Sequence, residues 1–567
     1  MKKFLRKLFI FTFLLLFITV GCVPERVPEV PYPKPVITPD NPSLTYTSKV
    51  GKSITITPTY QYAEGATFKW EMEGKVLSTS ASLTFNSAVA GDYYVTLTVT
   101  NRSGSTSIEI KITVAEKLVP YIYMESLPGG YNLLKDEEFE FAPIVENEQG
   151  CSYIWSVDGV QAATTKNFKY KPAAIGKHTV TLKVTNEDGA AQLSLSVNVY
   201  QASDIPFSWS FERDVYNYST GRSIRIPIRE IKNGFDAEYI WSLDGVEVQR
   251  GAQTYYVCSE AAEGAHTLVV KMQNSYRTAT KKITINVCPK EGSYIRGGGT
   301  ALWNKVYEYL PAPGQFINED YTATTMEQAC AYAQKRLEEK GYLSLGGWGG
   351  YIVVGFDHSI LNDGGYNLAI TGNAFKNSSE PGIVWVMQDE NGNGLPDDTW
   401  YELRGSDYEA ETKDFYIRYT KPKGAGKAVV WSASDGTTGT IDYLGAYHKQ
   451  DYYYPAWVST TTYTLYGQLL KSKTSELAPN SWINGDFGWG YADNFSLIDR
   501  LSDDSNSNAD PADNHFKLSD AVTWDGKPAN LKYIDFVKVQ TAVNSKAGWI
   551  GELSTEVFGF KDYNMLK

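Results

Sequence analysis

The sequence predicts a mainly β protein, in which three tandem β-sandwich modules are followed by a larger, jelly-roll-like β domain with one or few helices. Three observations predict this. A short Trp-containing block recurs at Trp70, Trp155 and Trp241, which are 85 and 86 residues apart. Around each block, short runs alternate apolar and polar residues between turn-forming residues, as half-buried strands do. After about residue 289 the repeat stops, and ten of the 14 Trp lie beyond that point.

The bulk composition narrows the classes of function. A chain of 567 residues is longer than one hydrophobic core usually organises, which favours several domains. Hydrophobic residues make up 42% and there are 40 Tyr, enough for sheet cores and aromatic binding surfaces. The net charge is −12, and no run rich in Lys or Arg follows the first seven residues. Nucleic acid is therefore excluded as a partner.

Residues 1–21 have the layout of an export signal. A basic stretch at residues 2–7 precedes an apolar run at 8–20 that is too short for a comfortable membrane span. The run ends in ITVGC, which resembles the lipobox of bacterial lipoproteins. The resemblance implies that Cys22 is acylated and tethers the chain to a membrane through its acyl chains alone. The alternative is an ordinary cleaved signal followed by an unrelated Cys.

A proline-rich stalk is expected at residues 22–35. Seven prolines fall between Cys22 and Pro42, and such a segment favours the polyproline II conformation. At about 3.1 Å per residue, the segment from Cys22 to Pro42 would extend roughly 60 Å from the membrane.

The three modules are expected at residues 36–115, 116–201 and 202–288. Each combines a Trp-x-x-Asp/Glu-Gly block with a later strand block, namely AGDYYVTLTVTN, IGKHTVTLKVTN and EGAHTLVVKMQN. The central Trp of each module is expected to fill a sandwich core, and His178 and His266 to be structural. The pattern resembles the PKD family of immunoglobulin-like domains. That resemblance implies modules that act as spacers or protein-contact units.

Four cysteines remain after removal of the signal: Cys151, Cys258, Cys288 and Cys330. They show neither the CxxC pairs of a zinc site nor the density of a disulfide scaffold. A bond between Cys258 and Cys288 is one alternative, but buried free thiols are the main expectation.

The C-terminal domain is expected at residues 289–567, with one clear helix in TTMEQACAYAQKRLEEKGY. Met326, Ala329, Cys330, Ala333 and Leu337 form an apolar stripe with helical spacing. The other segments are aromatic strands and long polar loops, such as GGYIVVGFDHSI, GIVWVMQD, WYELRG and YIDFVKVQTAV. Few helices and many strands favour a jelly-roll-like sandwich with binding loops at one edge.

Two acidic loops are candidate calcium sites, because hard cations take several oxygen ligands from alternate loop positions. The first runs from Asp389 to Asp398, and it follows the EF-hand ligand spacing until Trp400 stands where a bidentate Glu belongs. Its candidate ligands are Asp389, Asn391, Asn393, Asp397 and Asp398. The second loop repeats the spacing more weakly with Asp504, Asn506, Asn508 and Asp510. The alternative for each loop is a solvated surface turn.

Aromatic rings among glycines are the candidate ligand contacts. Glycine allows close approach, and flat rings bury a large area at small entropic cost. Exposed rings of this kind suit sugar faces or a large planar cofactor; the alternative is that they cap the sandwich core. The candidates are Trp348, Trp400, Tyr401, Trp482, Trp489 and Tyr491.

Catalysis has little support, and we expect a protein that is not an enzyme. Asp357, His358 and Ser359 are consecutive, and consecutive strand residues point to opposite faces. GxSxG, HExxH and CxxC motifs are all missing from the sequence. A minor alternative is glycoside hydrolysis by carboxylates such as Glu380, Glu402 and Asp486, if the fold brings them together.

The order of these features resembles large cell-surface lipoproteins of Bacteroidetes. The segments LGGWGGYIVVGFDHSI, GNAF, SSEPGIVWVMQDENGNGLPDDTWYEL, DFGWGYADN and GELSTEV carry the resemblance. The group it points to is associated with cobalamin capture beside TonB-dependent transporters. It implies an outer-membrane lipoprotein facing the cell exterior, with a corrinoid as ligand and a TonB-dependent transporter or companion surface lipoproteins as partners. The alternatives are a glycan-binding protein of a polysaccharide-utilisation system and an adhesion or scaffold protein.

Overall fold

The structure is a computed structural model that describes residues 32–566, apart from 42, 126, 128, 260, 290–298, 479–480 and 502–510. The predicted signal, Cys22, residues 22–31 of the stalk and the second acidic loop lie outside the described residues. Within the described residues, the structure contains no helix with the length and apolar character needed to cross a membrane.

The three modules repeat one strand plan. Module 1 contains β1 (Val36–Thr38), β2 (Thr45–Lys49), β3 (Ile54–Ile56), β4 (Thr59–Gln61), β5 (Thr67–Met72), β6 (Lys75–Ser78), β7 (Leu83–Phe85), β8 (Gly91–Asn101) and β9 (Gly104–Ala115). Module 2 contains β10 (Tyr121–Tyr123), β11 (Tyr131–Leu134), β12 (Phe139–Phe141), β13 (Ile144–Glu146), β14 (Ser152–Val157), β15 (Val160–Ala163), β16 (Phe168–Tyr170), β17 (Gly176–Asn186) and β18 (Gly189–Tyr200). Module 3 contains β19 (Ser208–Ser210), β20 (Val215–Ser219), β21 (Ile224–Pro227), β22 (Arg229–Lys232), β23 (Glu238–Leu243), β24 (Val246–Gly251), β25 (Tyr255–Cys258), β26 (Gly264–Gln273) and β27 (Thr278–Cys288).

Each module pairs one five-stranded sheet with two short two-stranded sheets. The five-stranded orders are β2-β9-β8-β5-β6, β11-β18-β17-β14-β15 and β20-β27-β26-β23-β24. In every module the edge strand β2, β11 or β20 runs parallel to the last strand, and the other pairs are antiparallel. The prediction of tandem immunoglobulin-like sandwiches is therefore confirmed.

The repeated Trp residues form the centres of the module cores, as expected. Trp70, Trp155 and Trp241 are each 0% exposed. The indole N–H groups of Trp70 and Trp155 donate to the carbonyls of Ser80 and Thr165 at 2.9 and 3.1 Å. In modules 1 and 2, burying the ring while pairing its donor fixes the centre of the core, whereas the buried indole N–H of Trp241 in module 3 has no hydrogen-bond partner among the described residues.

The repeated His residues hold turns, which agrees with a structural role. Nδ1 of His178 lies 2.6 Å from the Asp158 carboxylate, and Nδ1 of His266 lies 2.7 Å from that of Asp244. The four described cysteines, Cys151, Cys258, Cys288 and Cys330, are free thiols. The alternative of a Cys258–Cys288 bond is therefore wrong.

The C-terminal domain is a set of antiparallel sheets with one α-helix among the described residues. Its first elements are β28 (Lys305–Leu310), α2 (Met326–Glu338), β29 (Leu343–Ser344), β30 (Tyr351–Leu361), β31 (Leu368–Gly372), β32 (Gly382–Met387), β33 (Trp400–Leu403), β34 (Thr412–Thr420), β35 (Val429–Ala433) and β36 (Thr438–Ile441). The rest are β37 (Thr462–Leu469), β38 (Thr474–Ala478), β39 (Ser481–Asn484), β40 (Ala512–Phe516), β41 (Ala521–Val522), β42 (Tyr533–Thr541), β43 (Glu556–Val557) and β44 (Gly559–Asp562).

Three larger sheets organise this domain, with orders β28-β30-β42-β32-β33-β41, β36-β35-β34-β37 and β40-β31-β44. The late strand β42 lies in the middle of the six-stranded sheet, between β30 and β32. Helix α2 covers one face of that sheet: Ala329, Ala333 and Leu337 are buried in the core, as the apolar stripe predicts. Met326 of the stripe is 38% exposed, because it begins the first turn of the helix.

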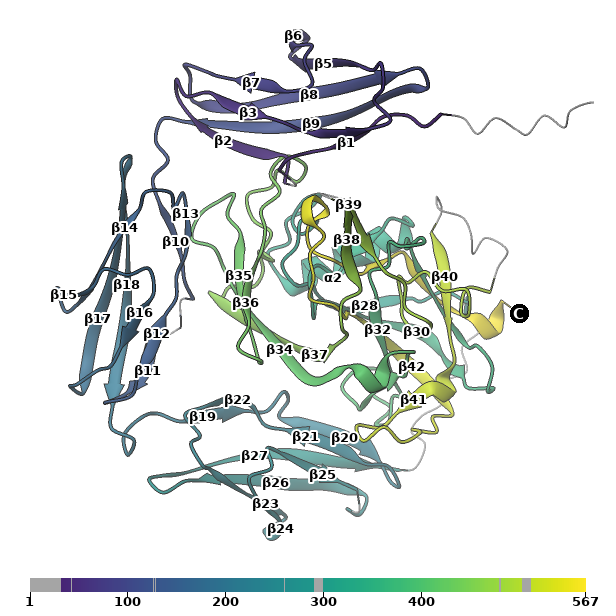
Figure 1. The fold of residues 1–567 in the computed structure, drawn as a ribbon. Helices are drawn as coiled ribbons and strands as arrows, with labels where there is room; N and C mark the ends of the chain where they lie inside the picture. The colour runs from purple at the N-terminus through teal and green to yellow at the C-terminus, as the bar shows by residue number, and fades with distance from the viewer. Residues whose placement is uncertain are drawn as a thin grey trace, which may run out of the picture.

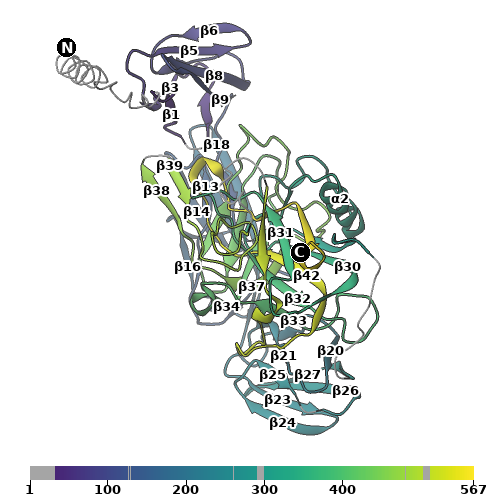
Figure 2. The ribbon, with the colours of Figure 1, turned by 90° about the vertical axis from the view of Figure 1, so that its right-hand side faces the viewer.

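The modules curve around the C-terminal domain in an arc (Figures 1 and 2). Each module makes an ion pair with that domain: Lys449 with Glu109 at 3.6 Å, Lys427 with Glu146 at 2.8 Å, and Arg225 with Asp414 at 2.6 Å. The sequence predicts modules that act as spacers or protein-contact units. In the structure, modules 2 and 3 flank the C-terminal domain, so they can contribute to its surface and its sites.

Candidate ligand-binding cavity

The six-stranded sheet turns one face to the core and the other to module 3. Alternation along β32 places Val384 and Val386 in the core and turns Trp385 to the opposite face. The strand register pairs Trp385 with Lys538 of β42 and with Glu402 of β33. A ring, an ammonium and a carboxylate from three adjacent strands therefore stand in one row on the face away from the core.

A cavity of about 680 Å³ lies between this face and module 3. We call it the interface cavity. The sheet contributes Glu308, Leu310, Tyr351, Val353, Trp385, Trp400, Glu402, Lys538 and Gln540. Module 3 contributes Glu212, Arg213, Tyr216, Arg225, Arg229 and Tyr255, and the rest of the C-terminal domain contributes Lys413, Asp414, Tyr466, Gln468 and Trp524. The volume is within the range of roughly 300–1,000 Å³ that small-molecule sites occupy.

Aromatic rings surround Lys538 in this cavity. Its ammonium lies 4.8 Å from the ring centre of Trp385, 5.2 Å from that of Trp400 and 5.9 Å from that of Tyr351. Burial lowers the pKa of Lys538 to about 8, because desolvation disfavours the charged form. Lys538 and Trp385 are candidate functional-site residues that were not predicted from the sequence. The available signal was a Lys and a Trp inside otherwise apolar strands.

Ion pairs hold the cavity walls together. Arg225 of β21 makes two bonds to Asp414 of β34, at 2.8 and 2.6 Å, and Arg229 bonds Glu212 at 2.6 Å. Burial opposes ionisation of Asp414, but the two guanidinium groups outweigh it and keep the pKa of this carboxyl below its usual value. The wall between module 3 and β34 is therefore a fixed network of charges.

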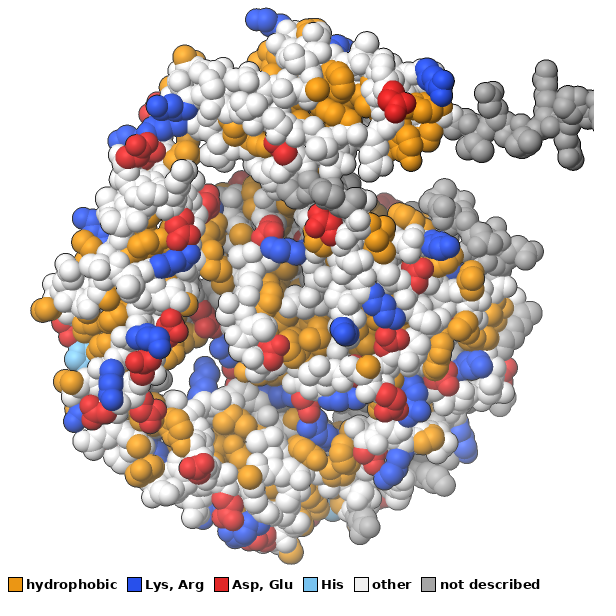
Figure 3. All heavy atoms as spheres, in the orientation of Figure 1, with side chains coloured by type: hydrophobic (Ala, Val, Ile, Leu, Met, Phe, Trp, Pro, Cys, Tyr) orange, Lys and Arg blue, Asp and Glu red, His pale blue; other side chains and the backbone are white. Residues whose placement is uncertain are grey.

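A second cavity of about 590 Å³ adjoins the first and reaches module 2. Arg225, Arg229, Asp414 and Tyr466 line both cavities, so the ion-pair network is the partition between them. Arg418 closes the far side by pairing with Glu125 of module 2 and Glu230 of module 3, at 3.3 and 3.0 Å. The space-filling view shows the hollow between modules 2 and 3 and the C-terminal domain (Figure 3).

Three of the predicted ligand contacts are buried, which corrects the expectation that they are exposed. Trp348 is 0% exposed: it packs edge-on against Phe415, and its indole donates to the Gln468 carbonyl at 3.2 Å. Tyr401 is 2% exposed and Tyr491 1%. Their glycine-rich or aromatic neighbourhoods are core packing, in which glycine makes room for a ring.

The other predicted rings divide between two locations. Trp400 is partly buried and lines the interface cavity, because alternation along β33 turns it away from the core side that Tyr401 occupies. Trp482 and Trp489 are partly buried and do not line the interface cavity. The structure therefore brings two of the six predicted rings to the lining of this cavity, Trp400 as a partly buried side chain and Tyr401 as a buried one.

The first acidic loop is a docking element for module 3. Asn217 donates to the Asp397 carbonyl at 3.2 Å, Arg213 donates to the Asp398 carbonyl at 3.0 Å, and Thr399 donates back to the Asn217 carbonyl at 2.9 Å. Asp398 is 3% exposed, and burial raises its pKa to about 7. The loop therefore lies in a domain interface, which differs from an open hairpin in solvent.

The polar side chains of this loop converge on hydrogen bonds within the loop itself. The Asp389 carboxylate accepts from the backbone N–H groups of residues 392, 393 and 394, which curls the loop. The side-chain amides of Asn391 and Asn393 both lie within 3.0 Å of the Asp397 carboxylate. In the part of the chain that the structure describes, His, Cys, Asp and Glu alone form no group of three or more able to hold a metal. A cation here would need the two Asn oxygens as well.

Of the three consecutive residues considered for catalysis, Asp357 and His358 are in contact, whereas Ser359 bonds a different carboxylate. His358 lies between the carboxylates of Asp357 and Asp562, at 2.7 and 2.9 Å, and Ser359 donates to Asp535. The contact between His358 and Asp357 corrects the expectation that neighbours on this strand point apart. It follows from a register irregularity in β30 between Gly355 and Ile360.

The carboxylates considered for glycoside hydrolysis lie in different surroundings. Glu402 lines the interface cavity and pairs with Lys413 at 3.9 Å. Burial raises the pKa of Glu380, and the negative charges of Glu556 and Asp493 raise it further. Asp486 accepts from Ser379 at 2.8 Å.

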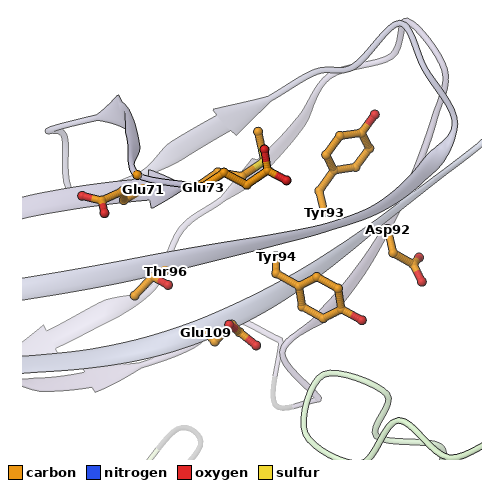
Figure 4. Close-up of a pocket in the computed structure, with 9 residues that line it drawn as sticks. Glu71, Glu73, Asp92, Tyr93, Tyr94, Thr96 and Glu109 are labelled. Atoms are coloured by element: carbon orange, nitrogen blue, oxygen red, sulfur yellow. The ribbon is translucent and has the colours of Figure 1, made fainter.

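A third cavity, of about 390 Å³, lies on module 1 (Figure 4). Glu71, Glu73, Asp92 and Glu109 line it together with Tyr93 and Tyr94. Lys449 of the C-terminal domain approaches Tyr94, with its ammonium 3.9 Å from the ring centre. Module 1 therefore uses this acidic cavity to contact Lys449, a basic side chain of the C-terminal domain.

Comparison with known proteins supports the module assignment. Residues 34–101 match the PKD-like domain family. Module 1 is therefore similar to PKD-like domains. Modules 2 and 3 share its strand order, so the chain carries PKD-like repeats of the immunoglobulin type, a class that is typically not catalytic.

Similar solved structures are tandem β-sandwich proteins. Fibronectin(III)-like modules of Clostridium thermocellum CbhA are 17% identical over 30% of this chain and 97% of theirs, with a TM-score of 0.17. The I67–I69 I-band fragment of titin is 13% identical over 46% of this chain and 99% of its own, with a TM-score of 0.15. Extracellular domains 3–5 of Drosophila OTK are 13% identical over 44% of this chain and 95% of their own, with a TM-score of 0.18. No curated protein matches this chain in sequence.

Proposed function

We propose that this chain is a lipid-anchored surface protein of the bacterial outer membrane that captures a nutrient in the interface cavity, with a corrinoid such as cobalamin as the ligand. The observation that carries the proposal is the cavity itself. It is about 680 Å³ in volume, it is lined by aromatic and charged side chains, and it lies between two domains. Concave, partly apolar sites between domains are where small ligands usually bind.

A corrinoid suits this wall chemically. Trp385 and Trp400 offer flat apolar faces to a planar ring system, and the side-chain amides of Gln468 and Gln540 offer donors and acceptors to its peripheral amides. The adjoining cavity of about 590 Å³ would take the parts of a large ligand that extend past the ion-pair partition. Binding would stack a ring on the sheet and rigidify the module 3 contact.

The second candidate is a glycan of a polysaccharide-utilisation system. The same rings suit sugar faces, and the partition of Arg225, Arg229 and Asp414 offers charged hydrogen-bond partners to hydroxyl groups. A third class, adhesion or scaffolding, would use the outer faces of the modules. In all three cases the protein binds and does not catalyse, and in the first two it hands its ligand to a TonB-dependent transporter or a companion lipoprotein.

Calorimetric titration tests the proposal directly. The chain from residue 23 onward is titrated with cyanocobalamin and with a panel of neutral and acidic oligosaccharides. We expect saturable binding of cyanocobalamin that W400A weakens strongly, while W489A, which changes a partly buried ring that does not line the cavity, leaves it unchanged. Binding of an oligosaccharide alone would favour the glycan candidate, and binding of neither class would overturn both.

We also propose that the first acidic loop takes calcium through Asp389, Asn391, Asn393 and Asp397 and stiffens the module 3 interface. The support is the convergence of those side chains and the docking of the loop on Asn217. Calcium should raise the melting temperature of the wild-type chain and not that of D397N. D435N, which changes a carboxylate in an exposed turn, is the matched control. An equal response of wild type and D397N would contradict calcium binding here.

A further inference from the structure

Lys538 differs from Arg225, Arg229 and Lys413 of the interface cavity in what it contacts. Arg225 and Arg229 pair with Asp414 and Glu212, both at 2.6 Å, and Lys413 pairs with Glu402 at 3.9 Å. Among the described residues, no carboxylate oxygen lies within 4.0 Å of the Lys538 ammonium. Its near neighbours are the rings of Trp385 and Trp400.

A second cation faces the same part of the cavity. Arg213 of module 3 lines the cavity, and its guanidinium donates to the Asp398 carbonyl at 3.0 Å, which is a neutral acceptor. The positive charge of Arg213 opposes protonation of Lys538, so the two groups are within electrostatic range of each other. Two cations from opposite walls therefore line the same cavity, and among the described residues neither has a carboxylate oxygen within 4.0 Å.

The surrounding acids do not neutralise this pair by contact. Glu212, Glu308 and Glu402 favour the charged form of Lys538 through longer-range attraction, and burial together with Arg213 works against it. Glu212 pairs with Arg229, and Glu308 accepts from the Tyr351 hydroxyl at 3.0 Å. Glu402 lies 3.9 Å from Lys413, whose closer partner is Glu411. A partly buried ammonium without a directly bonded anion is unfavourable, and a ligand that supplies the anion relieves that cost.

We propose that the interface cavity selects ligands that carry an anionic group, a phosphate ester or a carboxylate, which binds between Lys538 and Arg213 while the planar part of the ligand lies on Trp385 and Trp400. This inference rests on the proposed function, since it names the chemical class that the same cavity accepts. Of the candidate ligands, cobalamin meets the requirement through its phosphodiester, cobinamide lacks that phosphodiester, and among glycans only acidic sugars meet it.

Inorganic phosphate tests the anion site without assuming a ligand. Tryptophan fluorescence of the whole mature chain is followed during titration with sodium phosphate at constant ionic strength, with sodium chloride as the control. We expect a saturable change in the wild type, retention of affinity within a few-fold in K538R, and at least roughly tenfold weaker binding in K538M, which keeps the length of the side chain and removes its charge. Circular dichroism shows whether both variants are folded.

If K538M does not fold, R213M in the wild-type background replaces it, with the same expected loss. Equal phosphate titrations of wild type, K538M and R213M, or no saturable change in the folded wild type, would overturn the anion site.

A second arm separates this inference from the proposed function. Cyanocobalamin and dicyanocobinamide are titrated into wild type and K538R. Tighter binding of cyanocobalamin supports both proposals, and equal binding of the two corrinoids overturns anion selection while the corrinoid proposal stands. A saturable phosphate response without binding of either corrinoid supports the anion site and overturns the corrinoid.

Discussion

The substitution Arg225→Ala probes whether module 3 is held against the C-terminal domain by the ion-pair network. Arg225 bonds Asp414 twice, at 2.8 and 2.6 Å, across the domain boundary. A hydrogen bond to a charged group contributes about 1.5–3 kcal/mol to stability. The Asp414 side chain is 41% exposed, so solvent screening reduces the contribution of its bonds to Arg225. Arg229 also remains within 3.4 Å of Asp414 in the variant. We therefore expect a loss of about 1–2 kcal/mol, which is roughly a five- to thirtyfold shift in the docking equilibrium.

Hydrogen exchange measures that shift as a loss of protection. Amides of the loop at residues 389–399, which module 3 covers, should exchange roughly five to thirty times faster in R225A, because each opening event exposes them. R250A is the matched control, since Arg250 belongs to the same module and pairs with Glu238 and Glu247 within module 3 itself. Equal protection of this loop in R225A and R250A would show that the Arg225–Asp414 pair does not hold module 3 against the C-terminal domain.

Three further outcomes follow from the cores and the interface. Burial raises the pKa of Glu390 to about 8, so the folded state holds this proton more tightly than the unfolded state, and the stability of the protein falls as pH rises from about 4.5 to 8. E390Q should therefore have the melting temperature of the wild type near pH 5 and a higher one at pH 8. A difference in melting temperature that stays the same at both pH values would contradict this. W70A should destabilise module 1 by about 3–5 kcal/mol in urea unfolding, because it empties the centre of that core, and a loss below 1 kcal/mol would be inconsistent with the burial. In G405A the new methyl would meet the Tyr491 ring at 2.3 Å, so the melting temperature should fall by the equivalent of about 1–3 kcal/mol; an unchanged melting temperature would count against this packing.

The strands and modules were predictable because their signals are local. The Trp spacing and the alternating blocks indicate the sandwiches directly, and GGYIVVGFDHSI, GIVWVMQD, WYELRG and YIDFVKVQTAV correspond to β30, β32, β33 and β42. Helix α2 follows from its apolar stripe and from the Thr325 cap, whose hydroxyl accepts from the Gln328 N–H at 3.2 Å.

The candidate site was predictable only in part, because it depends on contacts between distant segments. Trp400 reaches the cavity through strand alternation, but whether a ring such as Tyr491 or Trp348 is exposed depends on what packs over it. Lys538 enters the site because β42 inserts between β30 and β32, and no local pattern shows that order. The docking of module 3 is likewise invisible in a sequence that reads as a string of spacers.

Hydrogen exchange of the mature chain with and without cyanocobalamin tests the central claim that the ligand binds between module 3 and the C-terminal domain. With the ligand bound, we expect slower exchange on both walls of the interface cavity, in β32, β33 and β42 of the sheet and in β21 and β25 of module 3. Protection confined to the aromatic segment at residues 482–491, with both walls of the interface cavity unchanged, would contradict it.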